Sequence, residues 1–505
     1  MITWINKIHR VKLCGVLFSL FTFHYSLFTS VALFTSVALT SCDDYIDITP
    51  KGAITVDSVS QYYELIVIPQ RCYNVASFYM LSDDAWAKES NIIGNENRSF
   101  DGINFTFNEQ AERTIIADNN LYTNIYAYIM RMNLVIDNIE KAAGDGTLKT
   151  LGKAEARVLR AWDHFVAVNL YAKSYTPATA AEDGGVCIMN HYDLEAVPSK
   201  STVAQVYDFI ISELEDAVPL LEEHPVNIYH PNKAYGYGLL SLVYLFHRDW
   251  EKARDAAQQS LALNNALVDY NEIPSSGFYS FRKYANENNP EVLSYMWMGS
   301  GWTLEAVALY AHGQISPELV GLFDTENDLR YSKFLRQSGN SIVSYFDVGS
   351  GAAIWTPATD SSRFTYITVG LRTAEVYLIM AEAYARLGNL TEAKKYVETL
   401  RAHRIKGGNG TIVTPANQKE MMDQIILERR KELLYGFHRF FDLKRFNTEP
   451  EYAKTTTRVF PVVNVSTEYP QQTYTLRPDS RLYIIPFPRT ARDKNPNLTL
   501  NTDEK

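Results

Sequence analysis

Cysteine is scarce in this chain, with four residues among 505. Exported domains that depend on disulfide frameworks carry more cysteines at regular spacings, so a framework of that kind is excluded. Common catalytic motifs are missing too: there is no HExxH, no CxxC, no serine-elbow motif and no phosphate-cradling glycine loop. The ten histidines show no metal-ligand spacing. We therefore expect a protein that is not an enzyme and needs no metal or other cofactor.

An excess of positive charge is also missing. The chain has 48 Lys and Arg against 58 Asp and Glu, which gives a formal net charge of -10. Proteins that bind nucleic acid need basic surfaces to meet the phosphate backbone, so nucleic acid is excluded as a partner. Hydrophobic residues make up 46% of the chain, enough for one large core or two ordinary ones.

The longest apolar run lies near the N-terminus. Basic residues precede it, and it ends in Leu-Thr-Ser-Cys at Cys42, which looks like a lipobox. We predict that residues 1–41 are a lipoprotein signal peptide and that Cys42 is lipidated. An uncleaved membrane anchor stays open as the alternative, because the run approaches the ~20 residues that a spanning helix needs. Cys72 and Cys187 are then expected to be buried small side chains.

Helical spacing is clearest between residues 371 and 404. Apolar and small residues recur there at helical intervals, break at Gly388-Asn389, and resume at Ala393 and Val397. This predicts two antiparallel helices of the tetratricopeptide type, which cannot bury their apolar face alone and need similar neighbours. A shift of 140 residues finds such a neighbour, matching Tyr237, Leu240, Ser241, Tyr244, Ala253 and Ala257 to Tyr377, Met380, Ala381, Tyr384, Ala393 and Val397.

Other periodic segments extend this scaffold. We expect Asp57 or Ser58 to cap the first helix and Ser201 or Thr202 to cap a later one. The fold class predicted is mainly α, a tetratricopeptide-like scaffold of about four helix pairs. These pairs are 59–68 with 119–141, 151–172 with 202–222, 232–247 with 250–264, and 371–387 with 390–404.

Residues 266–370 differ from the repeats. They are rich in Gly, Ser, Asn and aromatic residues, and strand-like alternation appears at 291–298 and 363–370. A segment this long is rarely an unstructured connection, so we predict a partly β, ligand-binding insertion. It separates an N-terminal part, 42–265, from a C-terminal part, 371–505, within one compact unit. The tail from residue 450 is irregular, with a strand-like RLYIIPF at 481–487.

The charged run Glu428–Glu432, followed by His438, Arg439 and Asp442, is the cluster that most resembles a catalytic site. A structural interpretation explains it better. Arg429 or Arg430 could pair with Asp442 beneath an apolar seam. The seam would consist of Leu433, Leu434, Phe437, Phe440 and Phe441, with Gly436 as a left-handed helix end.

Several blocks together resemble the SusD-like (SusD/RagB) family of outer-membrane nutrient-binding lipoproteins. In chain order they are AEARVLRAWDHFVAVNLY, STVAQVYDFIISELEDA, NKAYGYGLLSLVYLFHRDWEKA, LRTAEVYLIMAEAYARLGN and ILERRKELLYGFHRFFDLKRF. The resemblance covers nearly the whole mature chain. It departs after Tyr171, where a Gly-Asp-Val-Pro continuation is missing, and at the C-terminal end, which lacks a closing Gly-Tyr.

This resemblance implies a non-catalytic lipoprotein, anchored in the outer membrane and facing outside. It would bind an oligosaccharide and deliver it to a SusC-like TonB-dependent transporter. It also implies a ligand site built from the segment after the first helix and from the insertion. Aromatic rings there would stack on sugar faces while polar groups meet the hydroxyls. The residues in those segments are Tyr79, Asp83, Asp84, Trp86, Tyr295, Trp297 and Trp302.

Two alternatives remain open at this point. One branch of the family takes peptides, so an oligopeptide-capturing protein of the same architecture is possible. A glycoside hydrolase would need two carboxyl groups about 5–10 Å apart across a sugar. Asp83-Asp84 and Glu222-Glu223 are the acidic pairs considered for that role.

Overall fold

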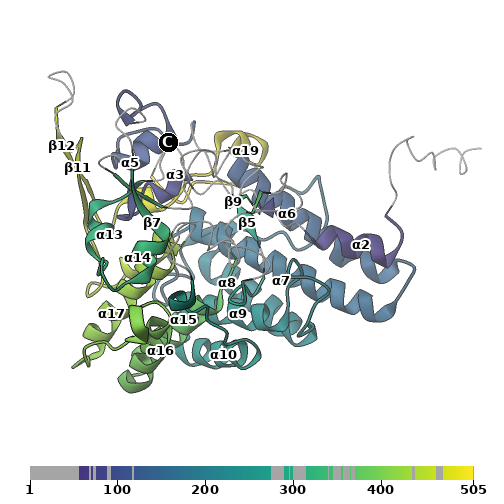
Figure 1. Cartoon of the computed structure of the whole chain (residues 1–505). Helices are drawn as coiled ribbons and strands as arrows, with labels where there is room; N and C mark the ends of the chain where they lie inside the picture. Colours follow the sequence, from purple (N-terminus) through teal and green to yellow (C-terminus); the bar gives the residue numbers. More distant parts are fainter. Residues whose placement is uncertain are drawn as a thin grey trace, which may run out of the picture. The chain divides into compact units, whose positions relative to one another are not determined.

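The computed structural model is shown in Figure 1. It describes residues 56–67, 70–71, 76–87, 92–115, 119–273, 289–294, 296–298, 314–338, 341–344, 354–355, 364–365, 370–434, 438–461 and 470–503. Residues 58–505 belong to one unit. The predicted leader, Cys42 and Cys72 lie outside the described residues, whereas Cys187 is a buried free thiol.

The repeat scaffold is a series of helices that pack on one another along the chain. They are α2 (Val59–Ile66), α6 (Asn119–Asn138), α7 (Gly146–Tyr171), α8 (Val203–Ala217), α9 (Lys233–His247), α10 (Trp250–Leu263), α15 (Thr373–Arg386) and α16 (Leu390–Ala402). Two further helices, α17 (Gln418–Glu432) and α18 (His438–Phe446), follow the repeats. The predicted mainly α fold with a tetratricopeptide-like scaffold is thus confirmed.

The 140-residue offset corresponds to a real structural repeat. Arg248 and Gly388 occupy equivalent positions between paired helices, and both adopt a left-handed backbone, with φ of 67° and 81°. The next residue in each repeat, Asp249 or Asn389, caps the second helix of its pair by accepting a backbone N–H. The equivalent pairs therefore turn in the same way, although only one of them uses the glycine that this conformation favours.

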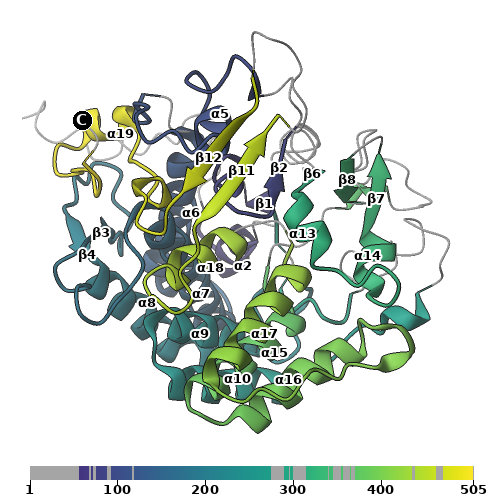
Figure 2. The same ribbon diagram turned by 90° about the vertical axis from the view of Figure 1, so that its left-hand side faces the viewer.

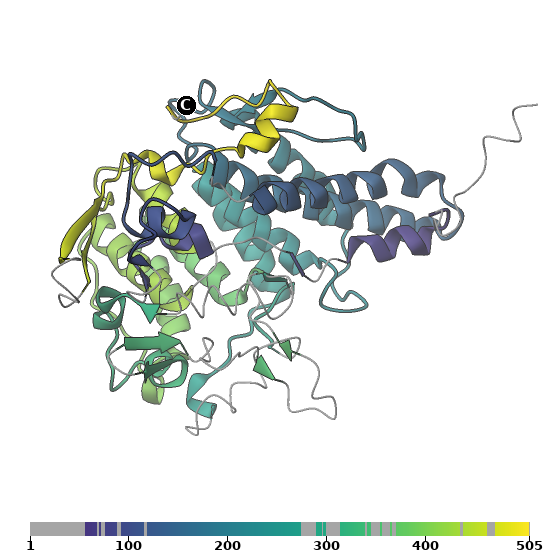
Figure 3. The same ribbon diagram turned by 90° about the horizontal axis from the view of Figure 1, so that it is seen from above.

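Both predicted capping sites are confirmed. Ser58 caps α2 and Thr202 caps α8, each in a capping box with a glutamine three residues later, Gln61 or Gln205. The pairing of the first helix differs from the prediction. The short helix α2 contacts both α6 and α7, while α6 packs mainly against α7, as Figure 3 shows. Helix α2 has 8 residues, so it is too short to pair along the 20 residues of α6. It covers part of the surface that α6 and α7 form together.

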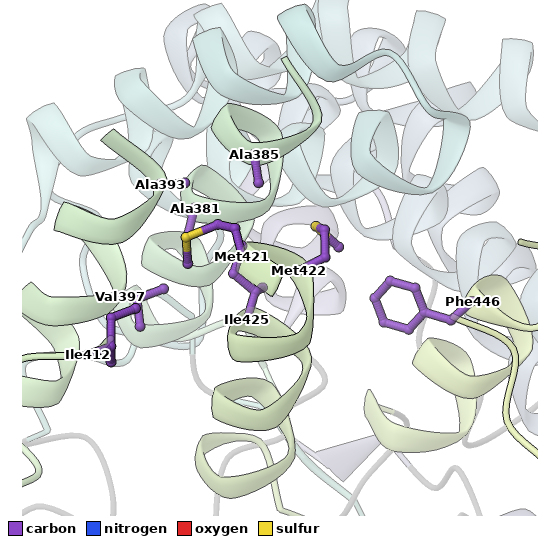
Figure 4. Packing of buried hydrophobic residues seen from close by; sticks show 9 residues of the cluster. All are labelled: Ala381, Ala385, Ala393, Val397, Ile412, Met421, Met422, Ile425 and Phe446. Atoms are coloured by element: carbon purple, nitrogen blue, oxygen red, sulfur yellow. The ribbon is translucent and has the colours of Figure 1, made fainter. Parts of the chain in front are cut away.

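Helix α17 closes the core at the last repeat. Met421, Met422 and Ile425 pack against alanines of α15 and α16 (Figure 4). The whole cluster contains Ala381, Ala385, Ala393, Val397, Ile412, Met421, Met422, Ile425 and Phe446. Alanine lets the helix backbones approach closely, and the flexible methionines fill the remaining space.

Short elements make up most of the rest. The helices are α3 (Ala76–Tyr79), α5 (Phe100–Phe105), α13 (Pro317–Gly321), α14 (Leu329–Phe334) and α19 (Arg489–Lys494). Strands β2 (Ala85–Trp86), β6 (Gln314–Ile315), β8 (Ser341–Ser344) and β7 (Leu335–Ser338) form one sheet in that order. Two-stranded pairs are β1 (Gln70–Arg71) with β5 (Trp297–Met298), β3 (Gly184–Cys187) with β4 (Lys200–Thr202), β9 (Ile354–Trp355) with β10 (Phe364–Thr365), and β11 (Thr456–Phe460) with β12 (Gln472–Leu476).

The prediction for the C-terminal tail was wrong in one detail. The strands lie at β11 and β12, whereas RLYIIPF begins as a 3-10 turn at Arg481–Tyr483. The carbonyls of this segment accept hydrogen bonds from the buried guanidinium of Arg113. Its Ile485 N–H bonds to the carbonyl of Leu170. Its apolar residues therefore serve packing, not sheet pairing.

The charged run of α17 is buried and paired, which confirms the structural interpretation. Arg429 Nε lies 2.6 Å from Asp442 Oδ2, and Arg445 Nε lies 2.9 Å from the other oxygen of the same carboxylate. Burial alone would raise the pKa of Asp442, but the two arginines outweigh it and hold the pKa at about 2. Leu433, Phe440 and Phe441 of the predicted seam are buried, whereas Gly436 and Phe437 lie outside the described residues.

A second buried ion network surrounds Glu432 at the end of α17. Arg404 Nε lies 2.9 Å from Glu432 Oε2, and Arg404 Nη2 lies 2.7 Å from Glu291 Oε1. Arg372, which precedes α15, reaches both carboxylates. Arg330 of α14 pairs with Glu428 at 2.6 Å and with Asp328 at 2.8 Å. These contacts attach the described part of the insertion to the last repeat.

A buried histidine joins α7 to the segment just after β3. His164 Nδ1 lies 2.9 Å from the carbonyl oxygen of Arg160, and its Nε2 accepts the N–H of Met189 at 3.3 Å. The ring is therefore neutral, with its proton on Nδ1. Burial lowers the pKa of His164 to about 4.

This arrangement predicts a loss of stability in mild acid. The unfolded chain protonates His164 near its ordinary pKa of about 6.5, while the folded protein resists protonation until about 4. Unfolding is therefore favoured as the pH falls from about 6.5 to about 4, by up to roughly 3 kcal/mol. Denaturation at several pH values should show that His164→Gln flattens this slope, whereas His224→Gln, at an exposed position, keeps it. Equal slopes in both variants would contradict the assignment.

Candidate functional site

Four of the predicted site residues lie on one loop, residues 79–86, which runs from the end of α3 into β2. In Figure 2 this segment lies beside the hairpin of β11 and β12. Tyr79, Asp83 and Asp84 are buried, with 6%, 3% and 2% of their surface exposed, whereas Trp86 is only half-buried. Among these four, Trp86 is the side chain that reaches the surface.

The two aspartates are held by arginines from the end of the chain. Arg439 Nε and Nη2 bind the two oxygens of Asp83 at 2.6 and 2.7 Å. Arg430 Nε and Nη2 bind Asp84 Oδ1 at 3.0 and 2.6 Å. Lys454 completes the set, 2.6 Å from Asp83 Oδ2. Burial alone would raise the pKa of Asp83, but Arg439, Arg430 and Lys454 hold it far below its usual range.

The backbone of the same loop is fixed as well. Arg458 of β11 donates to the carbonyls of Met80 and Ser82, and to Phe105. Its guanidinium lies 4.4 Å from the ring centres of both Phe105 and Phe107. Ser316 donates its N–H to the Asp84 carbonyl at 2.8 Å, and its hydroxyl donates to the Asp83 carbonyl at 2.6 Å. The side chains of Asp83 and Asp84 and the carbonyls of the loop are thus held by different partners, which fixes the position of the loop.

Trp86 occupies the edge of a small aromatic cluster. Its ring meets Phe105 and Phe460 edge to face, with ring centres 5.9 and 6.0 Å apart. Phe105 and Phe460 are fully buried, and Trp86, Ile93 and Tyr474 are the partly buried members around them. The indole is therefore anchored from the inside while part of it faces solvent.

The insertion reaches this loop through strand pairing. Trp86 lies opposite Gln314 in the β2–β6 pair, and Trp297 lies opposite Gln70 in the β1–β5 pair. The two segments that the resemblance selected are therefore neighbours, although more than 200 residues separate them. Tyr295 and Trp302 lie outside the described residues, as does the side chain of Trp297. Their contribution to a site stays a prediction.

The structure places three of the predicted site residues inside the protein. Tyr79, Asp83 and Asp84 face the interior, and both carboxylates are occupied by guanidinium groups, so their position suits support of the loop and not contact with a ligand. The same pairing weighs against Asp83 and Asp84 as glycosidase carboxylates. Glu222 and Glu223, the other acidic pair considered, are exposed neighbours after α8.

A cavity elsewhere does not compete as a ligand site. It lies among helices α7, α9, α15, α17 and α18, where Glu375, Arg429 and His438 are its charged or titratable lining residues. Its volume of about 20 Å³ suits a single water molecule. Ligand pockets for small molecules are more than ten times larger, typically about 300–1,000 Å³.

The described residues lack two other features. No group of three or more His, Cys, Asp or Glu residues there is arranged to hold a metal ion. Within the same residues, no helix has both the length and the apolar character that crossing a membrane requires.

Comparison with known proteins places this geometry in a family. The SusD family model matches residues 283–503, and a SusD-like model described as "Starch-binding associating with outer membrane" matches residues 56–245. The chain belongs to the SusD-like family. Two SusD-like proteins of Formosa agariphila are similar to it in sequence. SusD-like protein P2 is 25% identical and covers 74% of this chain and 78% of its own length. SusD-like protein P38 is 22% identical and covers 84% and 92%.

Solved structures share the fold of this SusD-like protein. A putative sugar binding protein from Bacteroides vulgatus aligns with a TM-score of 0.70 at 20% identity, over 90% of this chain and all of its own. Surface glycan-binding protein A from Bacteroides uniformis aligns with a TM-score of 0.64 at 16% identity, over 88% and 98%. The fold predicted from the sequence is therefore that of known SusD-like structures.

Two features of the site were missed by sequence reasoning. One is the set of arginines that holds the loop, namely Arg430, Arg439 and Arg458, and the other is the β11–β12 hairpin beside Trp86. An uninterrupted acidic pair within an otherwise apolar stretch, MLSDDAWA at 80–87, was a usable signal of buried ion pairs.

Replacement of Asp83 tests its supporting role. Asp83→Asn would leave the buried Arg439 without its paired carboxylate, so the free energy of unfolding should fall by about 3–5 kcal/mol. Glu318→Gln is the matched control, because Glu318 pairs with Arg430, which also pairs with Asp83 at 3.1 Å, but Glu318 is 46% exposed. It should cost less than about 1 kcal/mol. Chemical denaturation measures both. Normal stability in Asp83→Asn together with lost ligand binding would instead make Asp83 a ligand contact.

Proposed function

We propose that this SusD-like protein captures a glycan at the outer membrane without cleaving it. The observation that carries the proposal is the half-buried Trp86, which is presented on a rigid loop directly beside the insertion. A fixed aromatic ring at the surface suits the apolar face of a sugar, because little side-chain freedom is lost on binding. The names of the structural relatives, a putative sugar binding protein and a surface glycan-binding protein, support the same ligand class.

A binding role without turnover fits the electrostatics around Trp86. Hydrolysis of a glycosidic bond needs one carboxylic acid and one carboxylate facing the substrate. Near this loop, Asp83 and Asp84 are committed to ion pairs, and Glu318 pairs with Arg430 at 2.9 Å and with Lys454. These three acids therefore stabilise the frame, and stacking and hydrogen bonding at Trp86 are the proposed means of recognition.

We also propose that the protein is lipid-anchored through Cys42, faces outside, and delivers its ligand to a SusC-like TonB-dependent transporter. The lipobox-like sequence at Cys42 supports the anchor. The family description, which places such proteins at the outer membrane, supports the location. Wide helical surfaces on the repeat scaffold are suited to a protein partner, while the insertion side serves the ligand.

Glycan capture can be tested with a panel of polysaccharides. Affinity electrophoresis in gels that contain soluble starch, xylan, mannan or pectin should retard the purified protein in at least one case. Trp86→Ala should weaken that retardation roughly 3- to 10-fold, which is the loss expected for one stacking ring. Trp297→Ala and Trp302→Ala extend the test to the insertion.

Trp250→Ala is the control for that series, because Trp250 is also half-buried but stacks on Arg386 in the repeat scaffold. It should leave the retardation unchanged. Product analysis after long incubation with the retained polysaccharide should find no new reducing ends. Reproducible cleavage would show that the protein is a hydrolase. Binding of peptides, with no polysaccharide bound, would show that the ligand is a peptide and not a glycan.

The anchor has its own test in the native host. Mass spectrometry of the membrane fraction should find a mature N-terminus at an acylated Cys42, and Cys42→Ser should release the protein from the outer-membrane fraction. A transporter should co-purify with the wild-type protein. Detection of an intact Met1 in the membrane-bound protein would show an uncleaved anchor instead.

A further inference from the structure

The C-terminal hairpin has two different faces. In its antiparallel register Arg458 lies opposite Tyr474, and Val459 lies opposite Thr473. Directly opposed residues point to the same side of a sheet, so Arg458 and Tyr474 share one face. Val459 and Thr473 are on the other face, where Val459 is 45% exposed.

The first of these faces, which we call the inner face, is attached to the Trp86 loop. Arg458 donates to the carbonyls of Met80 and Ser82 within the loop. Phe460 lies on the same face and contacts the ring of Trp86 edge to face, 6.0 Å between ring centres. Figure 2 shows the two strands next to β2. The hairpin therefore has a fixed position relative to Trp86.

Tyr474 is the aromatic residue of this inner face that stays accessible. Arg458 and Phe460 are buried, but Tyr474 is half-buried and packs at the margin of the cluster that includes Trp86. Gln472, opposite Phe460, is exposed and adds an amide to the same face. Trp86 and Tyr474 thus both pack against one buried cluster, although β2 and β12 are far apart in the chain, and the amide of Gln472 lies on the same face of the hairpin as Tyr474.

We infer that Tyr474 is a second stacking platform for the glycan bound at Trp86, and that the C-terminal hairpin forms one wall of the site. This inference rests on the proposed glycan-binding function. Two platforms on separate, rigid segments select a ligand by the shape of a chain of sugars, because successive rings must present their faces to both. The ligand class is accordingly an oligosaccharide or polysaccharide chain and not a single sugar.

The test uses the full mature protein and the polysaccharide that retards the wild type. Tyr474→Ala should weaken retardation roughly 3- to 10-fold, and Tyr474→Leu should do the same, because leucine fills the cluster but offers no flat ring. Tyr474→Phe keeps the ring and should stay within about twofold of the wild type. Val459→Ala, on the outer face of the same hairpin, should leave retardation unchanged. Thermal denaturation of each variant identifies any that are unfolded.

The outcomes separate this inference from the proposed function. Loss of binding in Trp86→Ala, with wild-type retention in Tyr474→Ala and Tyr474→Leu, overturns the second platform and leaves glycan capture intact. Failure of every polysaccharide to retard the wild type overturns both. Equal losses in Tyr474→Leu and Val459→Ala also overturn the inference, because the effect would then come from the hairpin as a whole.

Discussion

Helix α17 keeps the consecutive charged residues Glu428 to Glu432 inside the protein, and the remaining structure is arranged to neutralise them. Removing charges from water costs several kcal/mol each, so each buried charge needs a partner in good geometry. The partners come from several segments, among them Arg330 of α14, Arg404 after α16 and Asp84 of the loop before β2. Because hydrophobic contacts are not directional, these ion pairs specify which segments meet.

These ion pairs also attach the Trp86 loop to the scaffold. Arg430 and Arg439 belong to helices that pack on the last repeat, and they hold the aspartates that precede Trp86. Helices α17 and α18 thus connect the repeat helices to the loop, and the loop presents one aromatic ring, Trp86, at the surface. Stacking and hydrogen bonding require this kind of fixed geometry, because a mobile ring would lose conformational freedom on binding.

Much of the scaffold was predictable because its signals are local. Each capping glutamine lies three residues after its cap, and helical spacing and the turn at Gly388 also depend on neighbouring residues. The helical spacing and the turn recur at the 140-residue offset. The candidate site was only partly predictable. Asp83 and Asp84 looked like ligand contacts because their arginine partners lie 356 and 346 positions away. The hairpin was missed because β11 carries a buried arginine, which disguises the apolar alternation of a strand.

The Trp86 loop is held by arginines that are synthesised long after the loop itself. The loop is made early, but Arg430, Arg439 and Arg458 are among the last residues to be added. Until they emerge, Asp83 and Asp84 have no counter-ions, and hydration keeps them out of the core. Contacts between residues 346 and 356 positions apart are non-local, and non-local contacts slow folding. A chain cut short near residue 425 would lack all three arginines, so the placement of Trp86 at the surface depends on the C-terminal part of the chain.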